Sequence, residues 1–254
     1  MAMNGPLPGS QAADLPEGDA AGLDAFIGKR HARWPEWDIA EVFLPAPQRP
    51  LARAWLTLLQ ELGDAAWGGG DALPGQAKLA WWHDELQGWN QRRRRHPLAP
   101  ALLARPASWA ALATALPALR DSRERPGDST EAVAVLAPFA VAAAAVEAEL
   151  FEVPEASTAS GDLASALLAE RLLHHRDGAA PLQALAQAGG QATRAWAAAL
   201  LASWPQGAPV ARARRLQALL QRARLEQLAA GATVPQPLSR WRTLWRGWQA
   251  ARRG

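Results

Sequence analysis

Apolar positions recur at helical spacing over most of this chain. After Pro50, the residues Leu51, Trp55, Leu58 and Leu62 fall three or four positions apart, as they do on one face of a helix. Helices are also expected from residue 23 and over 79–89, 98–104, 108–119, 130–151, 163–173, 182–188, 192–204, 211–230 and 238–251. Strand-forming runs are almost absent and the loops are short, so the pattern predicts an all-α, single multi-helix bundle.

The start of the domain follows from the same pattern. Residues 1–21 are Gly, Pro, Ala and acidic residues without periodicity, which predicts a disordered tail before one helical domain over 22–254.

The longest apolar run lies between Glu131 and Glu147 and contains Pro138. It is shorter than the roughly 18 residues of a membrane span, so we interpret it as a buried helix. No signal peptide is evident, and we expect a cytoplasmic protein.

The charge is unevenly distributed along the chain. Arginine supplies 25 of the 27 basic side chains, and there is no Tyr or Cys, so the pI of about 10.4 accompanies a net charge of only +3. The pI is therefore weak evidence for nucleic acid, which we do not expect as a partner. Residues 205–254 hold ten Arg and one Glu, a charge of +9, which leaves −6 on residues 1–204. A basic C-terminal end favours anionic lipid or an acidic protein partner.

Sequence motifs for catalysis are missing. The histidines His31, His83, His96, His174 and His175 do not have the spacing of a zinc site, and there is no nucleophile elbow, P-loop or dinucleotide fingerprint. We therefore expect neither a metal nor a cofactor on this evidence.

The segment 43–103 carries a family resemblance. Its distinctive features are Phe43-Leu44-Pro45 followed by Arg49, the run 58–62 that ends in Glu61-Leu62, the run from Lys78 to Asp84 that includes Trp81-Trp82, and His96-Pro97-Leu98. This segment resembles the squalene/phytoene synthase family. It is most similar to a divergent branch without aspartate-rich motifs, which includes mitochondrial complex I assembly factors and uncharacterised bacterial relatives. The resemblance extends more loosely over roughly residues 23–250.

The resemblance implies the isoprenoid synthase fold and a comparison with its chemistry. The family's enzymes join two prenyl diphosphates, using Mg²⁺ held by two Asp-x-x-x-Asp motifs. This chain has no Asp pair at i, i+4. Glu61 and Asp64 stand at the first motif and Glu147 in the region of the second, and Arg49 and Lys78 are the candidate diphosphate partners. We favour the interpretation that Glu61 and Asp64 are ordinary surface carboxylates.

The last helix offers a second candidate site. Trp241, Trp245 and Trp248 form a stripe that Arg242 and Arg246 flank. A basic helix with such a stripe suits a membrane interface. The spacing equally suits a helix packed on the bundle with its arginines in water, and we favour that interpretation.

Two functions follow from these expectations. The first is a squalene/phytoene synthase-like protein without catalysis, which acts as a binding or assembly factor at the membrane surface. It would have an isoprenoid or lipid ligand, a protein partner and a peripheral location at the inner membrane. The alternative is a divergent Mg-dependent prenyl diphosphate transferase of isoprenoid biosynthesis, which would use Glu61, Asp64 and Glu147 to hold metal.

Overall fold

The N-terminal helix begins earlier than the sequence pattern predicts. The computed structural model describes residues 17–153, 159–176, 178–205 and 211–252, and α1 runs over Glu17–Arg33. The predicted tail over 1–21 is therefore too long, because its last residues already belong to a helix. Residues 1–16 lie outside the described part of the chain.

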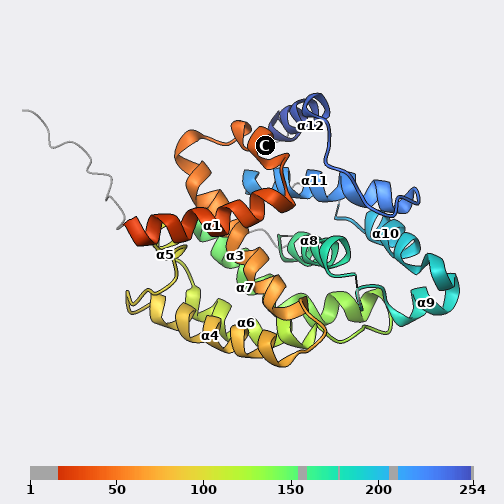
Figure 1. Cartoon of the computed structure of the whole chain (residues 1–254), viewed down its shortest axis with the longest axis horizontal. Coiled ribbons are helices and arrows are strands. Elements are labelled where there is room, and N and C mark those ends of the chain that lie inside the picture. Colours follow the sequence, from red (N-terminus) through yellow and green to blue (C-terminus); the bar gives the residue numbers. More distant parts are fainter. Residues whose placement is uncertain (1–16, 154–158, 177, 206–210, 253–254) are drawn as a thin grey trace, which may run out of the picture.

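Every regular element of the described residues is helical, which confirms the all-α prediction (Figure 1). A short segment after α1 holds α2 (Trp37–Ala40) and the 3₁₀ turns η1 (Glu41–Phe43) and η2 (Ala46–Gln48). The remaining elements are α3 (Arg49–Trp67), α4 (Leu73–Trp89), α5 (Ala99–Leu102), α6 (Trp109–Asp121), α7 (Ser129–Phe151), α8 (Ala159–His174), α9 (Leu182–Ala188), η3 (Gly189–Gln191), α10 (Ala192–Ala202), α11 (Arg212–Ala229) and α12 (Arg240–Arg252).

Helix α7 shows how local sequence fixes an element. The side chain of Asp128 accepts a hydrogen bond of 2.9 Å from the backbone N–H of Glu131. Glu131 in turn accepts one of 2.6 Å from the backbone N–H of Gly127. The first bond satisfies an N–H group that the first turn of a helix leaves free, and the second fixes the residue before the cap. The helix ends at Glu152, which adopts the left-handed conformation with φ of 52°.

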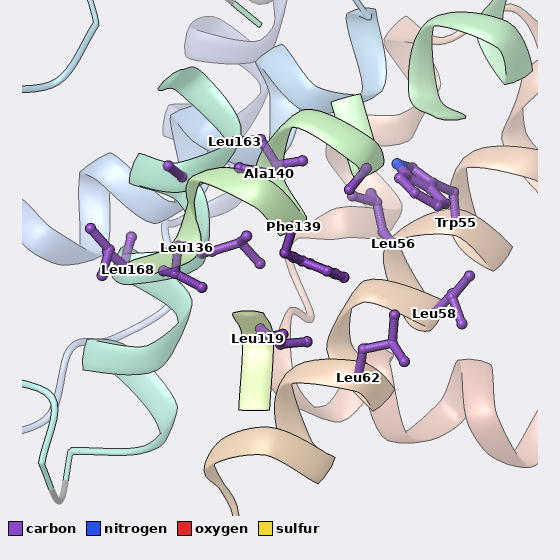
Figure 2. Close-up of a cluster of buried hydrophobic side chains, with 14 of the residues drawn as sticks. Trp55, Leu56, Leu58, Leu62, Leu119, Leu136, Phe139, Ala140, Leu163 and Leu168 are labelled. Carbon is purple, nitrogen blue, oxygen red and sulfur yellow. The ribbon is translucent and has the colours of Figure 1, made fainter. Parts of the chain in front are cut away.

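The core forms around α7, which packs between α6 and α8. Phe139 of α7 is fully buried beside Leu58 and Leu62 of α3 and Leu119 of α6 (Figure 2). Leu163 of α8 lies on the opposite side of α7 (Figure 2). The apolar residues that the periodicity placed on one face of each helix thus meet in a single core.

By length and composition, α7 is the one helix of the described residues that qualifies as a candidate membrane span. In the fold it is a core helix, with Leu136, Phe139, Val146 and Leu150 fully buried. Its position between α6 and α8 agrees with the interpretation of the 131–147 run as a buried helix.

Candidate functional site

The two carboxylates of α3 are buried, so the interpretation of Glu61 and Asp64 as surface carboxylates is wrong. Glu61 is 1% exposed, and the side chain of Asp64 is 13% exposed. The two residues are three positions apart and share one face of α3. Helices α1, α4 and α8 cover this face. The apolar periodicity of α3 did not reveal that cover.

Basic side chains from α1, from α4 and from the residue after α8 surround these carboxylates. Lys29 of α1 donates to Glu61 at 2.8 Å and lies 2.9 Å from Asp64, and Lys78 of α4 donates to Glu61 at 2.7 Å. Arg33 of α1 donates to Asp64 at 2.9 Å, and His175, directly after α8, is hydrogen-bonded to the same carboxylate at 2.9 Å. The only two lysines of the sequence therefore converge on Glu61.

This charge cluster keeps both carboxylates ionised. Burial by itself would raise the pKa of Glu61, but the hydrogen bonds from Lys29 and Lys78 lower it below the usual value. Burial likewise opposes ionisation of Asp64, and His175 and the neighbouring cations hold the pKa of that carboxyl well below its usual range. These cations compensate the negative charge of the two carboxylates, as a bound metal ion can in other proteins.

Glu147 occupies a separate site on α7. Its carboxylate accepts hydrogen bonds of 2.7 and 2.5 Å from Arg214 of α11 and one of 2.8 Å from the indole N–H of Trp55. Glu147 and Arg214 are both 4% exposed, so this is a buried bidentate ion pair. It joins α3, α7 and α11 at the centre of the bundle.

A small cavity lies between α1, α3, α8 and α11. Its volume is about 40 Å³, and its lining consists of Arg30, Leu56, Leu59, Gln60, Leu163, Ala166, Leu167, Glu170, Arg214, Gln217 and Gln221. Glu61, Asp64 and Glu147 do not belong to this lining. The three candidate carboxylates therefore do not face one another across this cavity.

The candidate residues do not fit a magnesium clamp. Each of the three carboxylates is already matched by Lys or Arg at hydrogen-bond distance. In the part of the chain that the structure describes, no cluster of three or more His, Asp or Glu side chains could hold a metal ion. Of the expected diphosphate partners, Lys78 does lie beside Glu61. Arg49 instead donates to the backbone carbonyls of Leu44 and Val42.

The last helix presents its tryptophans to solvent, so the favoured prediction of a packed stripe is wrong. Trp241 is 82% exposed, Trp245 60% and Trp248 42%. The face that packs on α2, η1 and α11 instead contains Thr243 and Gly247, which are buried. A Cβ at Gly247 would lie only 2.6 Å from the ring of Phe43, so the small residue allows this close approach.

Asp162 of α8 is a buried group that the sequence did not single out. It is 2% exposed, and neither carboxylate oxygen has a hydrogen-bond partner among the described residues. Burial raises the pKa of Asp162 to about 6, an effect that nearby Arg214 opposes and Glu147 reinforces. No local pattern marks such a residue, because its neighbours come from helices far away in the sequence.

The charge cluster predicts a measurable coupling between Lys78 and Glu61. Lys78→Met should lower the free energy of unfolding by about 1–2 kcal/mol, because a buried carboxylate loses one of its two cations while the other remains. In a Glu61→Gln background the same substitution should cost less than about 0.5 kcal/mol. Urea denaturation of the four proteins measures this double-mutant cycle, and an equal cost in both backgrounds would contradict the coupling.

Asp162 predicts a pH dependence of stability. Its pKa is raised in the folded state above about 3.9 in the unfolded chain, so its contribution is complete below pH 4 and is lost as the pH rises through about 6. Asp162→Asn should remove this decline and stabilise the protein at pH 7 by up to about 3 kcal/mol. Urea denaturation between pH 4 and 7 tests it. The exposed Asp84→Asn is the control, and the same profile for both variants would exclude the assignment.

No family model, no curated protein and no solved structure matches this chain.

Proposed function

We propose that this chain is a peripheral membrane protein that acts as a binding or assembly factor and docks on an anionic lipid surface through α12. The observation that carries the proposal is the outward orientation of Trp241, Trp245 and Trp248. Exposing three indoles to water is unfavourable, and contiguous exposed apolar groups mark interaction sites.

The tryptophans form one ordered surface. At 3.6 residues per turn, they fall on the side of α12 opposite Thr243 and Gly247, which pack on the bundle. The rings of Trp245 and Trp248 are stacked, with centroids 5.4 Å apart. The guanidinium of Arg252 lies 4.6 Å from the centroid of the Trp248 ring. Indole rings have an apolar body and a polar N–H, which suits the headgroup depth of a bilayer.

Arginines flank this surface and supply charge complementarity to anionic lipid. Arg240 and Arg242 are exposed at the start of the helix, and Arg246 lies 3.2 Å from Glu226 of α11. A basic side chain near an anionic membrane contributes about 1 kcal/mol of attraction. Arg240, Arg242, Arg246 and Arg252 of α12 thus place positive charge beside the tryptophans. The α11 arginines Arg214 and Arg224 are instead buried in ion pairs with Glu147 and Glu36.

A binding role is better supported than prenyl transfer. The resemblance to squalene/phytoene synthases suggests a scaffold for an isoprenoid or lipid ligand or for a protein partner at the inner membrane. The carboxylates at the positions of the catalytic motifs are engaged with cations of this chain, however. Binding diphosphate through Mg²⁺ would require these ion pairs to break, which costs several kcal/mol for a buried pair.

Membrane docking predicts a loss of vesicle binding when the tryptophans are removed. The protein should co-sediment with phosphatidylglycerol-containing vesicles. Combined Trp241→Ala, Trp245→Ala and Trp248→Ala should weaken that binding by at least about tenfold, because most of the inserting apolar surface is lost. Binding should also weaken with added salt and on pure phosphatidylcholine.

A matched control removes exposed apolar side chains elsewhere. Leu182 and Leu185 of α9 are 55% and 37% exposed, so combined Leu182→Ala and Leu185→Ala should leave vesicle binding unchanged. Equal loss in both variants would contradict a specific role of α12. Self-association through the tryptophans without vesicle binding, seen by analytical ultracentrifugation, would show that this face is a protein interface instead.

The proposal also predicts the absence of prenyl-transfer chemistry. With farnesyl or geranylgeranyl diphosphate and Mg²⁺, release of diphosphate should stay at the rate measured without protein, because the carboxylates that would hold the metal are ion-paired. A coupled phosphate assay measures the release. Robust turnover that disappears in Glu61→Ala would overturn the non-catalytic role.

A further inference from the structure

A cleft of about 740 Å³ lies beside the loop that connects α4 to α5, at a site that membrane docking does not use. Its lining comes from the end of α4, from this loop, and from the segment between α5 and α6. The lining residues are Trp89, Asn90, Arg92, Arg94, Leu103, Ala104, Arg105, Pro106, Ala107 and Trp109. The volume is in the range of pockets that hold small organic ligands.

A buried carboxylate fixes the conformation of this loop. Glu85 of α4 is 2% exposed and accepts hydrogen bonds from the backbone N–H groups of Arg95 and His96 at 2.7 and 2.9 Å. It also accepts from the Arg95 side chain at 2.8 Å and from the indole of Trp89 at 2.9 Å. The run Arg92–Arg95 is thus held at its C-terminal end by Arg95, while Arg92 and Arg94 are exposed and line the cleft.

Arg92 adopts a backbone conformation that is unusual for arginine. Its φ is 57°, in the left-handed region that a residue with a Cβ enters at an energetic cost. The backbone N–H groups of Arg92 and Arg93 donate to the carbonyls of Trp89 and Gly88 at 3.0 and 2.9 Å, which closes this turn after α4. The turn presents Arg92 at the cleft.

The cleft combines positive charge with an apolar floor. Arg92, Arg94 and Arg105 are among its lining residues, and none of the described residues that line it is acidic. Arg105 is held by the carbonyl of Leu150 at 3.1 Å and by Glu152 at 2.8 Å. The rings of Trp89 and Trp109 pack edge to face, with centroids 4.8 Å apart, and give the floor a rigid shape.

From this geometry we propose that the cleft binds a small organic oxyanion, a molecule with a phosphate or carboxylate group attached to a ring or other apolar portion. Arginine guanidinium groups match the planar, bidentate geometry of these oxyanions. The tryptophan floor suits the apolar portion. Residues 1–204 carry a net charge of −6, which disfavours an extended polyanion and leaves this basic cleft to a compact ligand.

The cleft and the proposed membrane surface are distinct. In Figure 1, α12 lies at the top of the molecule, while α4 and α6 lie at the bottom. Variants of the cleft can therefore be tested without altering the tryptophans of α12, and failure of one proposal leaves the other standing.

The test uses the full chain and three naphthalene probes. Isothermal titration calorimetry should detect binding of 1-naphthyl phosphate and 1-naphthoate, and binding of neutral 1-naphthol should be at least about tenfold weaker. Combined Arg92→Gln and Arg94→Gln should weaken binding of 1-naphthyl phosphate by at least about tenfold. Arg93→Gln is the matched control, because Arg93 belongs to the same loop but does not line the cleft, and it should change affinity less than about twofold.

A further arm of the test separates a free ligand from a lipid headgroup. The Arg92→Gln, Arg94→Gln protein should bind phosphatidylglycerol vesicles as the unmodified protein does. A comparable loss of vesicle binding would overturn the proposal of a small free ligand. Absence of 1-naphthyl phosphate binding at millimolar concentration, equal affinity for 1-naphthol, or equal loss in Arg93→Gln would overturn it as well. Circular dichroism confirms that each variant is folded.

Discussion

Buried carboxylates that require cationic partners organise this bundle. An ionised carboxylate taken out of water is costly unless a cation and hydrogen bonds compensate it. The pairs that meet this requirement are Glu36–Arg224, Glu41–Arg53, Glu61 with Lys29 and Lys78, Glu85–Arg95, and Glu147–Arg214. Glu36–Arg224 and Glu147–Arg214 join segments far apart in the sequence, whereas Glu41–Arg53 and Glu85–Arg95 are local. The hydrophobic effect drives the helices together, and these pairs select which helix faces which. Asp162 is the buried carboxyl without such a partner among the described residues, and its pKa moves instead.

The same constraint disfavours magnesium binding at these carboxylates. Carboxylates that hold magnesium must remain free of permanent internal cations. Here α1 and α4 supply lysines directly to Glu61, and α11 supplies an arginine to Glu147. These ion pairs hold helices together. The two surfaces proposed for binding lie at the periphery, on α12 and beside the loop after α4.

The bounds of the helices could be predicted from the sequence, but which of their faces are buried could not. The bounds 182–188 match α9, and the predicted 130–151 helix differs from α7 by one residue, because apolar periodicity and Gly or Pro breakers are local signals. Burial of Glu61 and exposure of Trp241 depend on which neighbours cover a face, and one helix seen alone does not contain that information. A stripe of tryptophans has the same spacing whether it faces a core or water. The informative signal was the pair of small residues, Thr243 and Gly247, on the other side of that helix.

The close contact between Gly247 and Phe43 has a consequence for orientation. Because even a Cβ at position 247 would meet the ring of Phe43, the contact disfavours rotation of α12 about its own axis. Turning the helix by one residue would force a bulky side chain into that contact. The bundle would therefore have a fixed orientation on any surface into which the tryptophans insert. In that orientation α4 and α6, which contribute residues to the arginine cleft, would lie on the far side of the molecule from the surface (Figure 1).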